Sequence, residues 1–584
     1  MAMAIGPLRR TIRAIRWHAP ALNFITFHYL YFLSTCLIAS VVFWGASTPP
    51  RSVSYTDSLF LTVSAMTLAG LNTINLSTLN TFQQFELFFL IIIGSAIFVS
   101  AFVVQVRKMA FEKRFNSIAE MRQRRTQRPT NLSNATTDPH PENASRSAAD
   151  WLSSNSSGSI SRNSQFHHLT EEERAALGGY EYRAIQLLAW LVPAYFVLFQ
   201  LLGALGLGAY VAMNRPSLAR ENGLNPWWVG SFNAISAFNN SGMSLLDANM
   251  VAFQTSVYML LTMGFLIIAG NTCYPIFLRL IVYALLKLHP KNERWEDSRR
   301  TLQFLLDHPR RCYTNLFPAR HTWWLLSSVV CLNGIDWAAF EILNIGNEAI
   351  TSLPANIEIL DGLFQAFAVR SGGFYVVLIP NVRVSLQVLY VIMMYISVYP
   401  VVITMRNSNV YEERSLGIYA DDPGYAATQL QTRTNIFNKL RRKMTNRSSE
   451  QTKSYFVRQQ LRAQLAHDLW WVVLAIFLIM IVEGSKFTAN PTLFSVFNVT
   501  FETVSAYGCV GISMGLPDQA YSFSGGLHTT SKLILCAVMI RGRHRGLPVA
   551  IDKAVLLPGE RVDVAEEEDA QIRMERTFSR GRAV

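Results

Sequence analysis

Four short stretches of the chain end in a glycine and can be aligned with one another, and their main-chain oxygens could surround an ion. They lie at 57–70, 229–242, 360–373 and 498–511. An alanine lies five residues before each glycine, and in three of them a serine lies six residues before it. Carbonyl groups of an extended segment can replace the hydration shell of a cation, and glycine suits the bend into such a segment because it tolerates positive φ. The predicted chemistry is coordination of a cation around Gly70, Gly242, Gly373 and Gly511.

The segments that must position these glycines are long and apolar. Each glycine stretch is itself too short and too polar to cross a bilayer, but it lies between two apolar runs. A bilayer core requires about 20 apolar residues per helix. The sequence thus predicts an all-α integral membrane protein with four repeats around a pseudo-fourfold pore, each a first span (M1), a re-entrant pore helix (P) and a second span (M2). The eight expected spans are 24–47, 82–106, 182–213, 251–286, 321–344, 384–405, 469–485 and 526–548.

Each pore helix is expected to begin at a polar residue that can cap its N-terminus. These are Asp57, Asn225, Asp361 and Thr492. The helix then descends to the middle of the membrane, where the negative partial charges of four C-terminal ends stabilise a cation. The chain returns outward after each glycine. The residues expected to flank the filter are Thr67, Leu71, Asn239, Met243, Arg370, Phe374, Val510 and Ile512.

The alternative is that each glycine merely lets two helices pack closely, as small residues commonly do in membranes. That explanation suits a single glycine. Four glycines in register, with a shared pattern before them, favour the pore.

The composition agrees with a membrane protein and explains the basic net charge. Half of the residues are hydrophobic and 16% are charged, a balance typical of a chain with many spans. The net charge of +13 comes from Lys and Arg concentrated in alternate loops, a bias that places both termini in the cytosol. Membrane topology accounts for the basicity, so no nucleic-acid partner is expected. The six cysteines are scattered and predict neither a disulfide framework nor a zinc site, although Cys509 lies two residues before a filter glycine.

Charged residues within membrane segments are costly and usually functional. Lys532 is expected below the fourth filter stretch, where it could face the pore and gate it. Pairing with a carboxylate such as Glu502, or snorkelling, explains it equally well. Glu502 could hold the filter scaffold or attract cations, and Asp247 could attract cations at the outer mouth. Arg370 is expected to point away from the ion and brace the filter, and Arg279 is expected to snorkel.

The polar segments divide the chain. Residues 129–178 are rich in Ser, Asn, Thr and Pro and contain too little apolar surface to fold, so disorder is predicted there. The predicted units are a cytosolic N-terminus (1–23), the first repeat (24–106), a cytosolic linker (107–181), the second repeat (182–286), a cytosolic loop (287–320), the third repeat (321–406), a second cytosolic loop (407–467), the fourth repeat (468–550) and a cytosolic tail (551–584).

Longer motifs cover most of the chain, from about residue 24 to 550. They include TLAGLNTINLSTLNTFQQ, SAFNNSGMSLLDANM, GNTCYPIFLRL, LLDHPRRCYTNLFPARHTWWLL, VRSGGFYVV, SAYGCVGISMGLP and SKLILCAVMIRGRHRGLP. In these motifs the sequence resembles the Trk/Ktr/HKT superfamily of potassium transporters, and its fungal Trk branch in particular.

The resemblance implies high-affinity potassium uptake at the plasma membrane, driven mainly by the membrane potential. Backbone carbonyls around the four glycines would coordinate K⁺. In plant HKT members a serine at the first filter position accompanies sodium selectivity, so Gly70 favours potassium. Lys532 looks like the basic residue of the family's last M2 helix. The resemblance also implies a homo-oligomer, a dimer or larger, that needs no cofactor.

The chain departs from its relatives in its regulatory parts. The insertion at 129–178 is far shorter than in many fungal members, and no appended nucleotide-binding regulatory domain is found. The alternatives to potassium uptake are a sodium-permeable HKT-like transporter and a membrane scaffold that does not conduct. All four glycines are present, which argues against the scaffold. An enzyme is not expected, because no metal-binding spacing and no nucleophile–base pair is found in the sequence.

Overall fold

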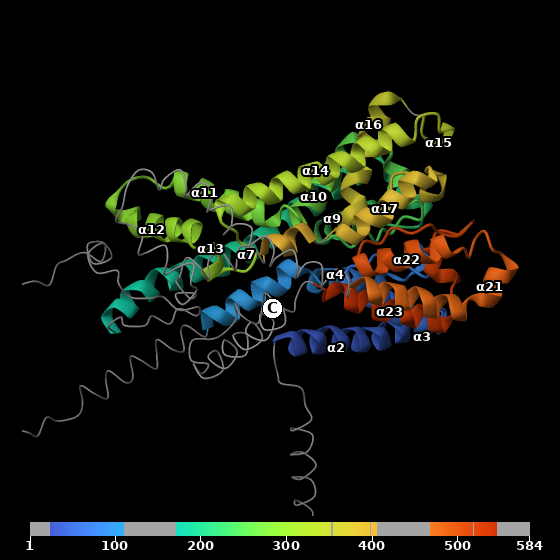
Figure 1. The fold of residues 1–584 in the computed structure, drawn as a ribbon, viewed down its shortest axis with the longest axis horizontal. Coiled ribbons are helices and arrows are strands. Elements are labelled where there is room, and N and C mark those ends of the chain that lie inside the picture. Colours follow the sequence, from blue (N-terminus) through green and yellow to red (C-terminus); the bar gives the residue numbers. More distant parts are fainter. Residues whose placement is uncertain are drawn as a thin grey trace, which may run out of the picture.

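The structure, a computed structural model, describes residues 24–109, 171–351, 354–397, 399–405, 468–517 and 519–545. Within these residues every regular element is a helix, apart from one isolated bridge between Leu516 and Gln519. The first and fourth repeats (blue and orange to red) lie together on one side, and the second and third (green to yellow) lie on the other (Figure 1). The predicted N-terminus (1–23), the loop at 407–467 and the tail at 551–584 lie outside the described residues.

Six of the eight expected spans are helices, or bent pairs of helices, that are long and apolar enough to cross a membrane. The four unbroken ones are built on α2 (Phe24–Gly45), α7 (Glu171–Asn214), α14 (Ala319–Leu343) and α17 (Val384–Ile396), the last continuing to residue 405. The two bent ones are the second helices of the first two repeats. They are α4 (Thr81–Ile93) with 96–109, bent by 56°, and α10 (Val257–Gly270) with α11 (Tyr274–Leu288), bent by 86°.

The two remaining spans are shorter than expected. The first is an apolar helix at Asp468–Val482. The second is α23 (Thr529–Arg543), which begins three residues later and ends five residues earlier than the predicted span at 526–548. α23 packs against the pore helix α22 (Val496–Gly508), and its Arg541 lies 5.8 Å from the ring of Trp471 in the helix at Asp468–Val482.

The bends in the second helices occur where a glycine lies against a pore helix. A Cβ at Gly94 would collide with the carbonyl oxygen of Met66, and one at Gly270 would collide with that of Phe238. In the fourth repeat, Gly542 has the same relation to the carbonyl group of Tyr507. Since glycine lacks a Cβ, the backbones can approach this closely.

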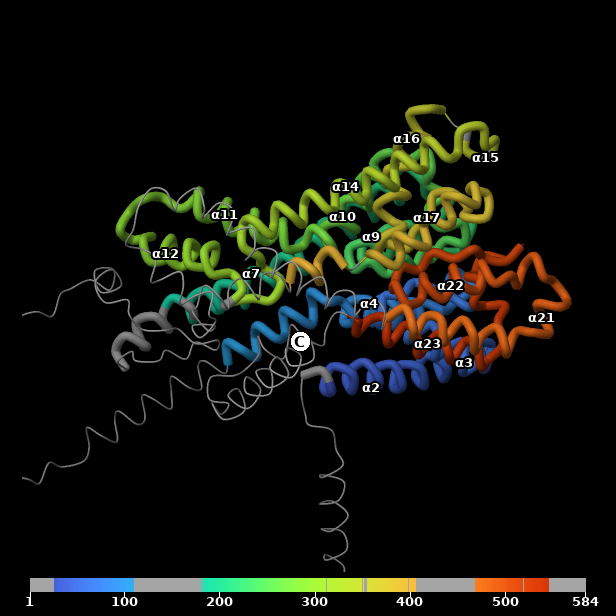
Figure 2. The backbone as a smooth tube through the Cα atoms, in the orientation of Figure 1, coloured from blue at the N-terminus to red at the C-terminus, as the bar shows by residue number. Residues whose placement is uncertain are grey.

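The pore helices and second helices form a closed ring. The pore helices are α3 (Tyr55–Thr67), α9 (Pro226–Asn239), α16 (Ala355–Phe367) and α22 (Val496–Gly508). Each second helix packs against the pore helix of the next repeat: α4 on α9, α10 on α16, α17 on α22, and finally α23 on α3. The red helix α23 therefore lies beside the blue helix α3 (Figure 2).

Three of the four predicted N-terminal caps of the pore helices are wrong. Asn225 caps α9 as expected, accepting a hydrogen bond from the amide of Trp227. The first pore helix is capped by Ser54 rather than Asp57, and the fourth by Ser495 rather than Thr492. The third begins after Pro354 without a side-chain cap, so Asp361 lies buried in its middle.

The predicted disorder at 129–178 is corrected at its C-terminal end, because residues 171–178 form the first turns of α7. This stretch contains Glu, Ala, Leu and Arg, which are good helix formers, and its acidic start suits a helix N-terminus. The remainder of the predicted disordered segment, 129–170, lies outside the described residues.

Shorter helices lie between the repeats or within them. The linker between the second and third repeats contains α12 (Glu293–Asp307), packed on α7 and α11, and α13 (Pro309–Cys312). The side of the molecule where this linker lies is called the linker side below. The other short elements are η1 (Leu76–Thr78), α8 (Pro216–Glu221), η2 (Asn249–Phe253), α15 (Glu348–Thr351), η3 (Ala368–Gly372), η4 (Ile379–Asn381), α21 (Gly484–Ala489) and η5 (Phe523–Gly526).

Candidate functional site: a ring of four glycines

The four glycines predicted to coordinate a cation meet at one level of the structure. A Cβ at Gly242 would lie 2.6 Å from the Cα of Gly373, and one at Gly511 would lie 2.9 Å from the Cα of Gly70. The first and second repeats meet through a main-chain oxygen: a Cβ at Gly70 would collide with the carbonyl group of Ser241. All four have positive φ, between 73° and 100°. Both their conformation and their spacing therefore require glycine.

Three of the pore helices end in the same way just before the ring. A residue in the left-handed conformation follows each helix: Leu68 (φ 60°), Asn240 (φ 59°) and Cys509 (φ 51°). The amide of the next residue then bonds to the carbonyl of the serine six residues before the glycine, as from Ala69 to Ser64 at 2.8 Å. The helix ends thus present their C-terminal carbonyl groups toward the ring.

The third repeat reaches the ring differently. Its pore helix continues into the π-helical turn η3, and the amide of Gly373 bonds to the carbonyl of Ala368 at 3.0 Å. This repeat also lacks the serine of the other three and has Phe367 in its place. The departure in sequence and the departure in structure therefore occur in the same repeat.

The flanking side chains are directed into the protein. Asn239 donates to the side chain of Gln200 (3.1 Å) and to the carbonyl of Ile235 (3.0 Å), and Thr67 donates to the carbonyl of Val63 (2.7 Å). The apolar flanking residues are buried, each at most 1% exposed: Leu71, Met243, Phe374, Val510 and Ile512. With these side chains occupied by packing, the backbone is left to line the ring.

Arg370 is buried in the same way. Its side chain is 2% exposed, and its guanidinium donates to the carbonyl of Ser397, which follows α17, at 3.5 Å. The carboxylate of Asp336 on α14 interacts with it electrostatically. Its guanidinium is therefore oriented toward the helices of its own repeat.

Glu502 lies at the centre of a scaffold in the fourth repeat. It is 1% exposed and accepts hydrogen bonds from the hydroxyl of Ser513 (2.6 Å), from the amide of Ser524 (2.9 Å) and from the hydroxyl of Ser524. Ser513 follows the ring glycine and Ser524 lies in η5. A carboxylate with such donors is well compensated for burial, and it connects the pore helix to the segment that returns from the ring.

The return segments of different repeats are bonded to one another. Asn72 and Ser522, which lie 450 residues apart, are joined by several hydrogen bonds, including one from the Ser522 amide to the Asn72 carbonyl at 3.0 Å. On the other side of the first repeat, the hydroxyl of Ser77 donates to Asp247 at 2.7 Å. Asp247 is thus a link between the first and second repeats.

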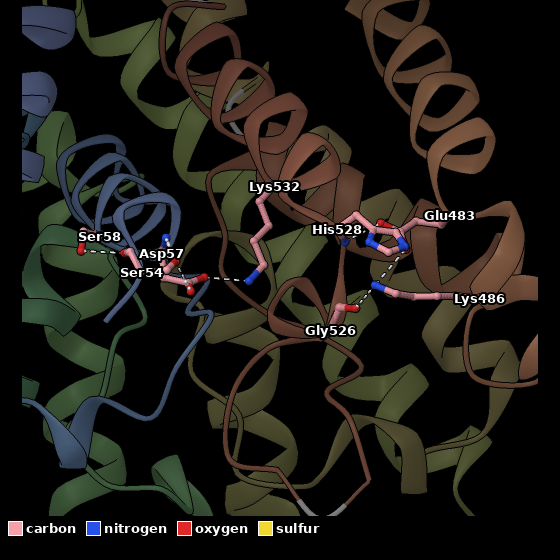
Figure 3. Close-up of polar contacts among 8 residues, drawn as sticks. All are labelled: Ser54, Asp57, Ser58, Glu483, Lys486, Gly526, His528 and Lys532. Atoms are coloured by element: carbon pink, nitrogen blue, oxygen red, sulfur yellow. Dashed lines mark hydrogen bonds and ion pairs between the residues drawn. The ribbon is translucent and has the colours of Figure 1, made fainter. Parts of the chain in front are cut away.

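Lys532 lies elsewhere than the sequence predicted. Its ammonium group is 2.7 Å from a carboxylate oxygen of Asp57, and both side chains are largely buried (Figure 3). Lys532 lies in the first turn of α23 and Asp57 in the first turn of α3, so the pair lies at the N-terminal end of a pore helix and not below the ring. Glu502 is not its partner. A second cluster, of Glu483 with Lys486, His528 and Ser531, holds the start of α23 nearby.

A cavity of about 260 Å³ lies on the linker side of the ring. It is lined by the ends of all four pore helices, with Leu68, Asn240, Ser371 and Cys509 among its walls. The pore-helix C-termini, which carry negative partial charge, therefore meet at this cavity.

Two arginines that line this cavity were not predicted as site residues. Arg543 donates to the carbonyl of Gly94 in the first repeat, and Arg545 donates to the hydroxyl of Ser397 (2.9 Å) and the carbonyl of Gly508 (3.1 Å). The signal was present in the motif RGRHRG, where three arginines follow an apolar helix. Arginines at the end of a span normally lie at the cytosolic membrane surface.

The model of the TrkH family, described as a cation transport protein, matches residues 114–563. The chain belongs to the TrkH family. The family is described as one of cation transport proteins, not of enzymes, and membership implies no cofactor. Among the described residues, no group of His, Cys, Asp and Glu could hold a metal ion.

Several fungal relatives are similar over most of this chain. Potassium transporter TRK1 of Candida albicans is 40% identical over 72% of this chain and 38% of its own length. The low-affinity and high-affinity potassium transport proteins of Saccharomyces cerevisiae are 40% and 38% identical, each over 69% of this chain, and over 46% and 35% of their own lengths. This chain thus spans less than half of the curated relatives it matches. The crystal structure of the potassium transporter TrkH from Vibrio parahaemolyticus aligns with a TM-score of 0.47 and 13% identity, covering 93% of this chain and 86% of that one.

Proposed function

We propose that this protein takes up potassium through the ring of four glycines, which acts as its selectivity filter. The observation that carries the proposal is the ring itself: four glycines with positive φ, from four repeats, in mutual contact. Filters of this kind coordinate dehydrated cations with backbone carbonyls. The proposal is also supported by the fungal relatives, which are named as potassium transporters.

The direction and the driving force follow from the charge distribution. In the sequence, Lys and Arg are concentrated in alternate loops and beside them, for example in Arg541, Arg543 and Arg545 at the end of the fourth repeat. The positive-inside bias supports a cytosolic location of the linkers and both termini. A cation that moves inward gains about 2.3 kcal/mol per 100 mV of membrane potential. Because fungal plasma membranes are strongly polarised, a pore of this kind can accumulate potassium at the plasma membrane without ATP.

We propose that Gly70, the first glycine of the ring, contributes to selectivity for potassium. Gly70 has φ of 75°, and any side chain there would meet the Ser241 carbonyl and the Gly511 backbone. A serine would displace the Ser241 carbonyl and alter the filter. A sodium-permeable transporter and a non-conducting scaffold are the competing functions.

Complementation in yeast cells that lack their own potassium uptake tests the function. We expect the chain to restore growth on micromolar potassium, which corresponds to high affinity; rescue at millimolar potassium alone would indicate low affinity. Gly70→Ser should weaken rescue and make growth more sensitive to sodium. Absence of rescue by a chain that reaches the plasma membrane would support the scaffold, and equal uptake of sodium by the wild type would support the HKT-like alternative.

A thiol reagent tests whether the cavity beneath the ring is the exit of the filter. Cys509 lines this cavity and is partly exposed. We expect MTSET, a small cationic methanethiosulfonate reagent, to block transport when applied from the linker side, because its adduct adds a bulky cation to the path. Cys509→Ala should resist the block. Cys331→Ala, which removes an exposed cysteine on α14, should remain as sensitive as the wild type.

A further inference from the structure

A segment of the linker between the second and third repeats lies beneath the pore, although it belongs to no repeat. This segment, 309–317 with the sequence PRRCYTNLF, is called the strap below. It starts with the helical turn α13 and continues without regular structure to the start of α14. Its residues Thr314 and Asn315 line the same cavity as the ends of the four pore helices. The motif that contains it, LLDHPRRCYTNLFPARHTWWLL, has no role in the proposed filter.

A tyrosine hydroxyl joins the strap to two repeats at once. Tyr313 is 3% exposed, and its hydroxyl lies 2.7 Å from that of Ser100 and 2.7 Å from that of Tyr274. Ser100 belongs to the second helix of the first repeat, and Tyr274 begins α11 in the second repeat. Buried hydroxyl groups that satisfy one another fix a backbone in place.

The strap backbone is held at two further points by arginines of the same two repeats. Arg107 donates to the carbonyl of Cys312 at 3.3 Å, and Arg279 donates to the carbonyl of Phe317 at 2.8 Å. Arg279 also donates to the carbonyl of Leu306, so it has defined partners and does not simply snorkel. Hydrogen bonds from a charged donor are stronger than neutral ones.

Buried side chains and contacts within the strap also stabilise its conformation. The side chains of Leu316 and Phe317 are fully buried and anchor one end. Within the strap, the guanidinium of Arg310 donates to the carbonyl of Thr314 and lies 5.8 Å from the ring of Phe317. These contacts hold the turn that directs Thr314 and Asn315 at the cavity.

We propose that the strap is the inner wall of the ion path, so that a cation leaving the glycine ring passes Thr314 and Asn315. The proposal rests on the proposed function. Arg543 and Arg545 add positive charge to the cavity, which disfavours a cation close to them. A hydroxyl and an amide from the strap supply neutral oxygen atoms that can partly replace a potassium ion's water. The linker between repeats thereby contributes directly to permeation.

Cysteine accessibility tests the strap. Thr314→Cys is made in a Cys331→Ala/Cys509→Ala background, because the other described cysteines are buried. In liposomes with MTSET on both sides, we expect this variant to be labelled and to lose most of its potassium flux. Potassium should slow the labelling relative to N-methylglucamine. Glu293→Cys, at the exposed start of α12 in the same linker, should be labelled with no loss of flux.

The outcomes separate the strap from the function of the whole protein. Flux through the unlabelled background tests potassium transport itself, whereas protection of the thiol by potassium requires no flux. Labelling of Thr314→Cys that neither reduces flux nor depends on potassium would overturn the proposal. Adding Tyr313→Phe to the Thr314→Cys variant provides a second measurement. This change keeps the aromatic ring of residue 313 and removes both hydroxyl contacts, so labelling of the cysteine at position 314 should become faster. An unchanged rate would show that Tyr313 does not hold the strap.

Discussion

Gly373→Ala is expected to abolish potassium uptake. A Cβ at this position would collide with the carbonyl oxygen of Val510 and lie 2.9 Å from the Cα of Gly242. Both neighbours are backbone atoms of the ring, so neither can move aside without moving a proposed ion ligand. Growth on micromolar potassium and rubidium uptake, corrected for the amount of protein at the plasma membrane, measure the effect.

The chain offers a control that separates this collision from the cost of the backbone conformation. Gly346 has φ of 76°, close to the 73° of Gly373, but a Cβ there would meet nothing within 4 Å. Alanine at either position must adopt the left-handed conformation, which costs about 1–2 kcal/mol. Gly346→Ala should therefore retain nearly normal uptake. Equal losses in the two variants would show that strain, rather than contact within the ring, explains the glycine.

The spans and the ring glycines were predictable because each has a local signal. A run of apolar residues identifies a span whatever surrounds it, and the repeated pattern before each glycine identifies the ends of the pore helices. Even the exceptional third repeat had a signal in Phe367, which replaces the serine of the others. The start of its helix had none, because the helix begins after Pro354 without any capping side chain.

The partners of charged residues were not predictable, because they come from distant parts of the chain. Asp57 and Lys532 are 475 residues apart and meet since the fourth repeat packs against the first. The position of Arg543 and Arg545 depends on helix length. The 15 residues of α23 extend about 22 Å, less than the roughly 30 Å of a bilayer core. The basic end of this helix therefore lies near the pore-helix ends, where a full-length span would have carried it to the surface.

Lys532→Met is expected to reduce sharply the amount of folded protein at the plasma membrane. It leaves the carboxylate of Asp57 without its cation at a site where that side chain is 16% exposed. Removing one partner of a buried pair costs about 3–5 kcal/mol, because the other charge remains uncompensated. Asp57→Asn should have a comparable effect through the unpaired ammonium group. Surface labelling and uptake per surface molecule measure folding and transport separately.

The double variant Asp57→Asn/Lys532→Met decides between a structural pair and a charge that acts on the ion. If the pair holds the first repeat against the fourth, removing both charges should restore much of the surface protein, since buried pairs can often be replaced by neutral groups. The two effects should then be strongly non-additive. If Lys532 acts on ions in the pore, as its sequence position suggested, Lys532→Met alone should change potassium affinity or sodium sensitivity at normal surface levels, and neutralising Asp57 should not reverse that change.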